Sequence, residues 1–270
     1  MEQWRLIVDV PAAGARNMAV DHAILEAVIA GTASPTLRFY QWHPACLSLG
    51  YGQHAHEVDL ARLTAHRFGV VRRPTGGQAV LHADELTYSI ALPDSHPLAQ
   101  GSIVESYRRL SDGLIAGLKA LGIAVRAEPR QQRISSISPV VCFESTSDYE
   151  ITCNGRKLVG SAQMRKRGGV LQHGSLPLVG DAARICEVLR YDTETARQDA
   201  RKSVLDRATT LEAETHTAPL FYQVAETLAE ALAAAYEVLF VRRVLDEDEH
   251  ARAIVLEDQI YGSDSWTFRR

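Results

Sequence analysis

Cysteine is scarce in this chain, and its thiols are widely separated. Cys46, Cys142, Cys153 and Cys186 are spread over 270 residues without any CxxC spacing. This wide spacing argues against a disulfide framework and against a cysteine-rich zinc site. We therefore interpret the cysteines as reduced thiols of a cytoplasmic protein, of which one is available for nucleophilic chemistry.

Long apolar runs and a strong charge of either sign are also absent. No stretch is apolar over the length that a bilayer requires, and no apolar segment follows residues 1–5 as it would in a signal peptide. The formal net charge of −4 argues against a surface built for nucleic acid. We therefore predict neither a membrane nor nucleic acid as a partner. The hydrophobic share of 46% is enough for a sizeable core.

No internal repeat or low-complexity linker divides the chain, so we predict one domain over residues 1–270. The periodicity of apolar residues predicts strands at 7–10, 36–40, 46–50, 86–92, 123–125, 149–153, 156–161, 169–178 and 236–241. It predicts helices at 17–30, with Asn17 as the cap, and at 58–67, 102–121, 181–189 and 220–236. Strands dominate the first two thirds, and the region from about residue 181 is mostly helical. The predicted fold class is therefore α+β, a mixed β-sheet with flanking helices.

A hairpin is the most specific local prediction. Asn154-Gly155 separates two alternating runs, and a two-residue turn of this kind needs positive φ at both positions. Such a turn pairs Cys153 with Arg156 and Thr152 with Lys157. Two faces follow from this register: Tyr149, Ile151, Cys153 and Leu158 on one, and Thr152, Lys157, Val159 and Ser161 on the other. Cys153 is therefore predicted to point away from Lys157, into the core.

A glycine-rich segment over residues 72–82 reads RRPTGGQAVLH and matches neither a GxGxxG nor a Walker motif. Paired glycines let the backbone pass close to a ligand without interference from a Cβ atom. Ala79, Val80 and Leu81, which follow them, suit an apolar wall. The alternative from spacing alone is a tight turn between two core strands, and the residues by themselves leave both readings open.

Three spaced motifs in order carry a resemblance to a known superfamily. They are RFYQWHPACLSLGYGQ at 38–53, RRPTGGQAVLH at 72–82 with ELTYS at 85–89, and GRKLVGSAQMRKRGGVLQHGSLPL at 155–178. Together they are similar to the lipoate–protein ligase and octanoyltransferase superfamily, which includes the biotin ligases. The resemblance implies the catalytic-domain fold of biotin/lipoate protein ligases and a glycine loop that lines the tunnel for an eight-carbon acyl chain. Two positions depart from the usual pattern: Gln78 stands where a basic residue is common, and Ala83 where aspartate often follows the histidine.

The resemblance also implies a set of site residues. Those implied to bind substrate are Arg72, Arg73, Thr75, Gly76, Gly77, Ala79, Val80, His82, Gly160, Ser161, Ala162 and His173. The segment 138–144, SPVVCFE, resembles the catalytic cysteine loop of the octanoyltransferase branch, and Lys157 resembles the lysine paired with that cysteine. Cys142 and Lys157 are thus the implied catalytic pair. The physical reason is that a nearby ammonium stabilises the thiolate, which is the nucleophile, and so lowers the pKa of the thiol. Burial statistics favour core positions for the other three cysteines.

The activity implied by the resemblance is protein N-octanoyl transfer in lipoate biosynthesis. An octanoyl group would move from octanoyl–acyl carrier protein to a lysine of an apo lipoyl domain, such as the glycine cleavage H protein, through a cysteine thioester. No cofactor is expected because the donor is already activated. No metal is expected either, since His54-Ala55-His56 lacks further ligands at suitable spacing.

Three alternative activities stay open: an ATP-dependent lipoate–protein ligase, an amidotransferase between lipoyl domains, and a non-catalytic acyl-binding regulator. The cysteine loop argues against the ligase and the regulator. The Arg165-Lys166-Arg167 turn is interpreted as solvated surface, with docking of the acidic carrier protein as the alternative.

Overall fold

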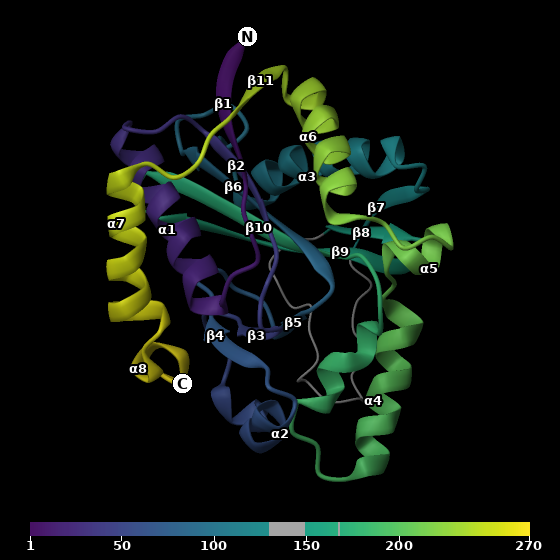
Figure 1. The fold of residues 1–270 in the computed structure, drawn as a ribbon. Coiled ribbons are helices and arrows are strands. Elements are labelled where there is room, and N and C mark those ends of the chain that lie inside the picture. The colour runs from purple at the N-terminus through teal and green to yellow at the C-terminus, as the bar shows by residue number, and fades with distance from the viewer. Residues whose placement is uncertain (130–148, 167) are drawn as a thin grey trace.

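The computed structural model describes residues 1–129, 149–166 and 168–270. Within these residues, eight strands form one mixed sheet in the order β11-β1-β2-β6-β10-β9-β8-β7 (Figure 1). Their bounds are β1 Glu2–Val8, β2 Thr36–Tyr40, β6 Glu85–Pro93, β7 Val125–Pro129, β8 Tyr149–Cys153, β9 Arg156–Lys166, β10 Gly169–Pro177 and β11 Val238–Arg242. β1 runs parallel to β11 and β2, and all other neighbours are antiparallel.

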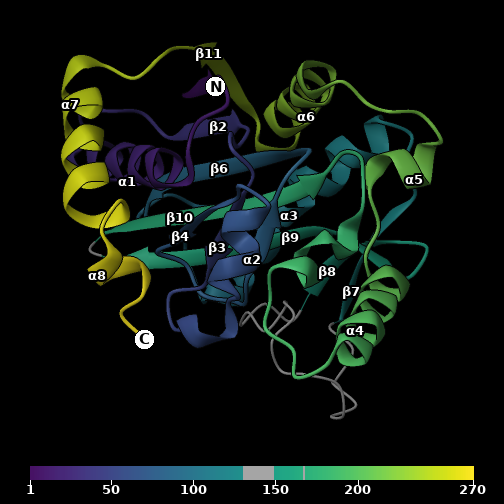
Figure 2. The ribbon, with the colours of Figure 1, turned by 60° about the horizontal axis from the view of Figure 1, so that its bottom comes forward.

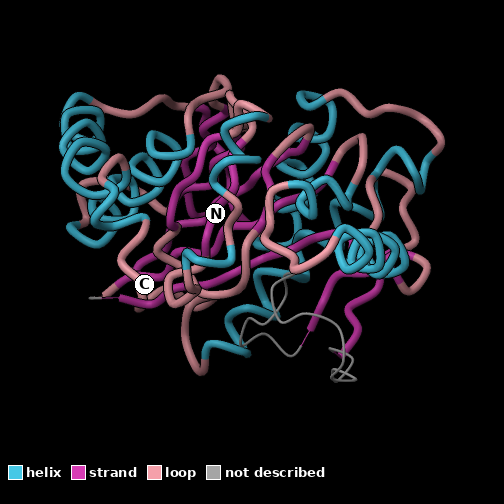
Figure 3. The backbone as a smooth tube through the Cα atoms, turned by 90° about the horizontal axis from the view of Figure 1, so that it is seen from below, coloured by secondary structure: helices cyan, strands magenta, loops and turns pink. Residues whose placement is uncertain are grey.

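Helices cover both faces of this sheet. α1 (Gly14–Ala30) and α7 (Glu247–Leu256) pack on one face, and α3 (Ile103–Ala120) and α6 (Phe221–Tyr236) pack on the other. The central strands β6 and β10 are therefore buried along almost their whole length. Seen from below, the strands occupy the middle of the molecule with helices at both sides (Figure 3).

A second, three-stranded sheet lies beside the first in the order β4-β3-β5 (Figure 2). Its strands are β3 Cys46–Leu49, β4 Gly69–Arg72 and β5 Val80–His82. A separate apolar cluster joins it to α2 (Leu60–Ala65), to the 3-10 helix η2 (Ala182–Glu187) and to α4 (Glu194–Arg207). The remaining short elements are η1 Ala55–Glu57, α5 Leu211–Thr215, the π-helical turn η3 Glu257–Tyr261 and α8 Asp264–Thr267.

The predicted fold class, a mixed sheet with flanking helices, is confirmed. The helix predicted at 102–121 is also confirmed, and it begins with a reciprocal capping box between Ser102 and Glu105. The prediction that Asn17 caps the first helix is wrong. Asn17 is buried inside α1, where its amide donates to the carbonyls of Ala12 and Gln41. The Asn17 amide is thus occupied by two carbonyl groups and is not available to cap the helix. The N-cap residue is Ala13, which makes no side-chain hydrogen bond.

The predicted pairing at the hairpin turn is confirmed, but the predicted side-chain face that contained Lys157 and Val159 is wrong. Cys153 pairs with Arg156 and Thr152 with Lys157, and Asn154 and Gly155 have φ of +50° and +73°. The register then shifts, so that Ile151 pairs with Val159. A bulge places one extra residue on one strand and turns the following side chains to the other face. Val159 is therefore buried in the core with Ile151 rather than facing the same side as Lys157.

Within the described chain, none of the helices combines the length and apolar character needed to cross a membrane.

Candidate active site

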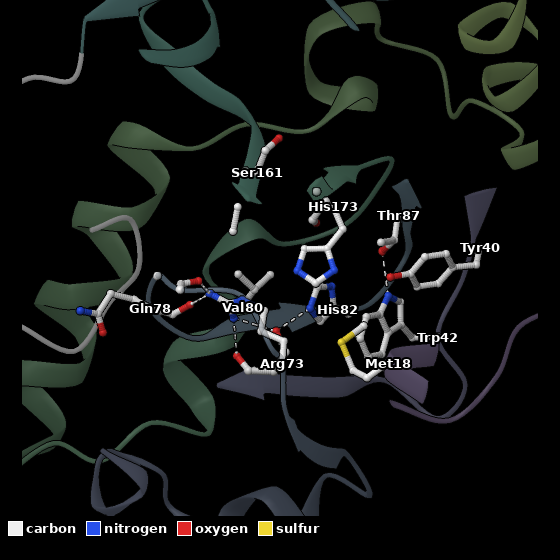
Figure 4. A pocket seen from close by; sticks show the side chains of 17 residues that line it. Met18, Tyr40, Trp42, Arg73, Gln78, Val80, His82, Thr87, Ser161 and His173 are labelled. Atoms are coloured by element: carbon white, nitrogen blue, oxygen red, sulfur yellow. Dashed lines mark hydrogen bonds between the residues drawn. The ribbon is translucent and has the colours of Figure 1, made fainter. Parts of the chain in front are cut away.

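A cavity lies between the two sheets, lined by strands from each (Figure 4). It holds about 500 Å³ of space between protein atoms, a figure that includes space open to solvent. Its lining residues are Met18, Tyr40, Trp42, Ser48, Arg73, Gly76, Gly77, Gln78, Val80, His82, Thr87, Gly160, Ser161, Ala162, His173, Gly174 and Ser175. We call this the acyl cavity, after the acyl chain that the sequence resemblance implies as its ligand.

Most of the substrate-binding residues suggested by the sequence meet in this cavity. Nine of them line it: Arg73, Gly76, Gly77, Val80, His82, Gly160, Ser161, Ala162 and His173. Thr75 lies behind the lining and holds the ring of His173, with 2.6 Å between Oγ1 and Nε2. Ala79 faces a neighbouring cavity instead. Arg72 lines neither of the two cavities in the described residues, because its side chain is fully buried and hydrogen-bonded to backbone carbonyls.

The glycine loop is both a tight turn and a cavity wall. Gly77 has φ of +92°, a conformation that L side chains rarely adopt. Its carbonyl oxygen lies only 1.7 Å from where a Cβ atom of Gly50 would stand. The loop after β3 therefore touches the glycine loop backbone to backbone, and the two readings left open by the sequence are compatible.

We expect Gly50→Ala to lower the free energy of unfolding by about 1–3 kcal/mol, as overpacking does. The new Cβ would displace the backbone at Gly77 and so the cavity wall. Gly52→Ala is the matched control because nothing lies within 4 Å of the place that its new methyl group would take, and we expect a change within about 0.5 kcal/mol. Urea unfolding of both variants measures the difference, and equal losses would contradict the close approach.

A second cavity adjoins the first and contains Lys157. The two share Val80, Gly160 and Ser175 in their walls. The ammonium of Lys157 forms an ion pair with Glu150, with 3.0 Å between Nζ and Oε1. Cys142, the cysteine that the sequence pairs with Lys157, lies outside the described residues.

The three described cysteines are buried, as the sequence predicted. Burial raises the pKa of the Cys46 thiol to about 12 and also raises that of Cys186. Burial, together with a hydrogen bond to the Glu214 carboxylate, raises the pKa of Cys153 to about 11. These thiols remain protonated at neutral pH, and a protonated thiol is a poor nucleophile.

Glu85 organises one side of the acyl cavity. Its buried carboxylate accepts hydrogen bonds from Thr87 and Ser175, and one oxygen lies 2.7 Å from Nδ1 of His82. The other ring nitrogen of His82 lies 2.7 Å from the Ser48 hydroxyl. The Trp42 ring stacks on His82 at 4.0 Å between ring centroids. The lining polar atoms are thus held in fixed orientations, as a site for one ligand pose requires.

Asp21 organises the other side. It accepts hydrogen bonds from Arg38, Tyr40 and Ser89, and its carboxylate lies 3.4 Å from Nδ1 of His173. Burial opposes ionisation of Asp21, but the Arg38 guanidinium and the hydrogen bonds outweigh it and lower the pKa of the carboxyl. Burial lowers the pKa of His173, against the opposing effect of Asp21, so its imidazole is neutral at neutral pH.

Sequence reasoning missed Asp21, Trp42 and Glu85 as members of the site. Glu85 opens the ELTYS motif, and Trp42 lies in the first motif, so both carried a signal through the resemblance. Asp21 carried a weaker one, a carboxylate within the apolar stripe of the first helix. A buried acid of this kind needs a buried partner, which Arg38 provides.

The basic turn before β10 is only partly described. Arg165 donates to the carbonyls of Gly101 and Ser102 and so holds the start of α3. Lys166 is exposed, and Arg167 lies outside the described residues. Among the residues that the structure describes, no group of three or more His, Cys, Asp or Glu side chains is placed to hold a metal ion.

Comparison with known proteins gives the family. The model of the lipoyl protein ligase A/B catalytic domain matches residues 13–233. The chain belongs to this family. Over its full length it is 41% identical to the octanoyltransferase LipM of Kyrpidia tusciae, which it also covers completely. It is 41% identical to that of Moorella thermoacetica, with 100% of this chain and 99% of the relative covered. Relatives of this similarity identify the chain as an enzyme, an acyltransferase.

Solved structures support the fold. The bi-partite lipoate protein ligase of Thermoplasma acidophilum, described with its E2 lipoyl domain, has a TM-score of 0.83 at 23% identity, covering 99% of this chain and 97% of that one. A lipoate-protein ligase A bound with ATP has a TM-score of 0.82 at 22% identity, covering 99% of both chains. At these identities the likeness shows the lipoate protein ligase catalytic fold that the sequence predicted and nothing more.

Proposed function

We propose that this chain transfers an octanoyl group from octanoyl–acyl carrier protein to a lysine of an apo lipoyl domain, with the glycine cleavage H protein as acceptor. It would act as a single cytoplasmic catalytic domain in lipoate biosynthesis. The observation that carries this proposal is the 41% identity to octanoyltransferases over the full length of the chain. The ligases among the solved structures are only 22–23% identical and so support the fold alone.

The proposed reaction has two steps. The thiolate of Cys142 attacks the thioester carbonyl of the donor, the carrier thiol leaves, and an octanoyl thioester forms on the enzyme. The amine of the acceptor lysine then attacks that thioester, an amide forms, and the Cys142 thiolate is regenerated as the amine releases its proton. The first step exchanges one thioester for another, and the second is downhill. No nucleotide is required for either.

Lys157 supports the first step in this proposal. An ammonium close to a thiol favours the thiolate and lowers the pKa of the thiol. Lys157 borders the cavity that adjoins the acyl cavity, so a thioester formed near it would have its acyl chain beside Val80 and Gly160. The buried, protonated thiols of Cys46, Cys153 and Cys186 make poor competitors for the role.

The acyl cavity suits the tail of the proposed substrate. Met18, Val80 and Ala162 supply apolar wall, and Gly76 and Gly77 leave the wall without side chains. Burial of the six methylenes beyond the carbonyl would stabilise the complex by about 5 kcal/mol, at about 0.8 kcal/mol for each methylene.

Mass spectrometry of the intact protein tests this function directly. Mixed with octanoyl–acyl carrier protein and no nucleotide, the protein is expected to gain one octanoyl group and to lose it when an apo lipoyl domain is added. Attachment of free lipoate that requires ATP would instead identify a ligase. Transfer only from an octanoylated lipoyl domain would identify an amidotransferase. If the protein gains no octanoyl group and transfers none, it would be a binding protein.

We expect Lys157→Ala to raise the pKa of the Cys142 thiol, because the variant removes the cation that favours the thiolate. The rate of alkylation by iodoacetamide, followed against pH, should shift its midpoint upward by about one unit or more. Lys166→Ala is the matched control, since Lys166 is an exposed lysine at the far end of the same strand, β9. An unchanged alkylation profile in Lys157→Ala would remove Lys157 from the proposed mechanism.

A further inference from the structure

Two adjacent arginines at the start of the glycine loop make contacts in different directions. Arg73 faces the acyl cavity, and its guanidinium donates to the carbonyls of Gly76 (2.8 Å) and Gln78 (2.7 Å) within the loop itself (Figure 4). Arg72 is the last residue of β4, and successive side chains of an extended chain point to opposite sides. The Arg72 side chain accordingly leaves the cavity and is fully buried elsewhere.

Arg72 joins two segments that are more than 200 residues apart in the sequence. Its Nη1 donates to the carbonyls of Gly50 and Gln53, at 2.7 Å each, in the loop after β3. Its Nε donates to the carbonyls of Thr267 (3.0 Å) and Trp266 (3.2 Å) at the end of α8. The indole of Trp266 donates back to the Arg72 carbonyl at 2.9 Å. One guanidinium therefore fixes residues 266–267 against the loop after β3.

The residues after α8 make further contacts with the loop after β3. The Arg269 guanidinium stacks on the rings of Tyr51 and Trp266, 3.8 and 4.2 Å from their centroids. It also donates to the Tyr51 carbonyl at 2.7 Å. The backbone N–H of Ala55 donates to the Arg270 carbonyl at 2.8 Å. We call residues 266–270 together with Arg72 the tail strut.

The loop held by the tail strut bears directly on the glycine loop. The Tyr51 N–H donates to the Thr75 carbonyl at 2.8 Å. Gly50 and Gly77 meet backbone to backbone, as described above. A displacement of the loop after β3 therefore moves the glycine loop. Because Gly76 and Gly77 line the acyl cavity without side chains, movement of their backbone changes the cavity itself.

Two further observations distinguish the tail strut from ordinary packing of side chains. Residues 266–270 lie beyond the part of the chain that the family model matches, 13–233. Arg72 has no carboxylate partner among the described residues, and its contacts there are backbone carbonyls. A planar guanidinium can bond several carbonyls at once in fixed directions, which the single ammonium of a lysine cannot do.

We propose that the tail strut is a positioning element that fixes the glycine-loop wall of the acyl cavity and thereby its preference for acyl chain length. The proposal rests on the proposed function for the identity of the acyl substrate. A hydrophobic pocket by itself discriminates weakly between chains that differ by a methylene or two. A backbone wall that is held at a fixed position would add discrimination between chain lengths beyond that which apolar contact provides.

Arg269→Ala tests the link to chain length, with Arg242→Ala, at an exposed arginine far from the glycine loop in sequence, as the control for loss of a guanidinium. Steady-state rates are measured with hexanoyl, octanoyl and decanoyl carrier protein. We expect Arg269→Ala to raise KM for the octanoyl donor by about fivefold with kcat within about twofold of the parent. Its preference for octanoyl over decanoyl should fall by about tenfold, which is within the range that one or two methylenes provide. Equal effects on all three donors, or none, would overturn the link.

Hydrogen exchange at residues 74–80 tests the strut without reference to activity. Arg269→Ala and Arg72→Lys should both speed amide exchange in this segment by about tenfold or more, while Arg242→Ala should not. Unchanged exchange in Arg269→Ala would overturn the strut, even if Arg72→Lys failed to fold. If the parent protein transfers no octanoyl group, the proposed function fails, and the exchange result still decides whether the strut positions the loop.

Discussion

A Cys142→Ala variant is expected to lose octanoyl transfer by about 10⁴-fold or more, since removal of a nucleophile from a covalent mechanism removes the intermediate itself. The same variant should show no octanoyl adduct after mixing with octanoyl–acyl carrier protein. Transfer is measured by the mass of the lipoyl domain over time. The melting temperature of the Cys142→Ala variant should remain close to that of the parent, which would show that the loss of activity does not come from unfolding.

Cys153→Ala is the matched control for that experiment. Cys153 is the described cysteine nearest in sequence to the proposed catalytic pair, and its thiol is buried against Glu214 with a pKa raised to about 11. We expect this variant to keep the octanoyl adduct and transfer at rates within a few-fold of the parent. Octanoylation that persists in Cys142→Ala, or that disappears in Cys153→Ala with the fold intact, would assign the chemistry to a different group.

Asp21→Ala is expected to destabilise the fold by about 3–5 kcal/mol, because it leaves a buried cation without its main partner. Arg38 is 1% exposed and lies between Asp21 and Asp9, with N–O distances of 2.8 and 2.7 Å. Asp21 also holds Tyr40 and Ser89 by hydrogen bonds. Urea unfolding measures the loss.

Asp9→Ala offers a control on the same arginine. The Asp9 side chain is 29% exposed, and partly solvated ion pairs contribute only about 0–1 kcal/mol. A loss in Asp9→Ala as large as that in Asp21→Ala would contradict the assignment of Asp21 as the main buried partner.

The pH dependence of stability gives a second readout for Asp21. Its folded pKa is lowered below the value of 3.8 that it has when unfolded. The unfolded chain therefore binds the proton first as pH falls, so the contribution is present above pH 3.8 and is lost as pH falls through the folded pKa. Asp21→Asn should lack this acid-induced loss. The lowered pKa of His173 acts in the same direction below pH 6.5, because the unfolded imidazole takes up a proton that the folded one does not.

Local patterns predicted the parts of the fold that depend on local physics. The Asn154-Gly155 hairpin, the amphipathic α3 and the strands β2, β3, β6 and β10 are found where the periodicity placed them, whereas β4 and β5 beside the glycine loop were not predicted. The bulge between Ile151 and Thr152 left no such mark, because it depends on how β9 fits both β8 and β10. Four C-terminal helices, α4, α5, α7 and α8, lie where no helix was predicted. α4 is strongly polar along its length, and α7 follows the last predicted strand, in a segment for which no element was predicted.

The candidate site divides in the same way. The glycine loop and the β9 and β10 residues of the acyl cavity were found through motifs that are contiguous in sequence. Arg72 was expected among the substrate-binding residues because it opens one of those motifs. The alternation of side chains at the end of β4 instead sends it toward Trp266 and Thr267. A contact across nearly 200 residues leaves no periodic signal in the sequence, so only the folded chain could reveal it.

The pairing of β1 with β11 constrains the order in which the molecule can be completed. Glu2 to Leu6 lie in register with Val238 to Arg242, so this edge of the sheet closes a loop that contains most of the polypeptide. Contacts of such long sequence separation form late and slowly. During synthesis on the ribosome, the first strand must therefore wait for its outer neighbour until almost all of the chain has emerged. Until then it carries an unpaired edge, and such an edge favours aggregation of an incompletely folded chain.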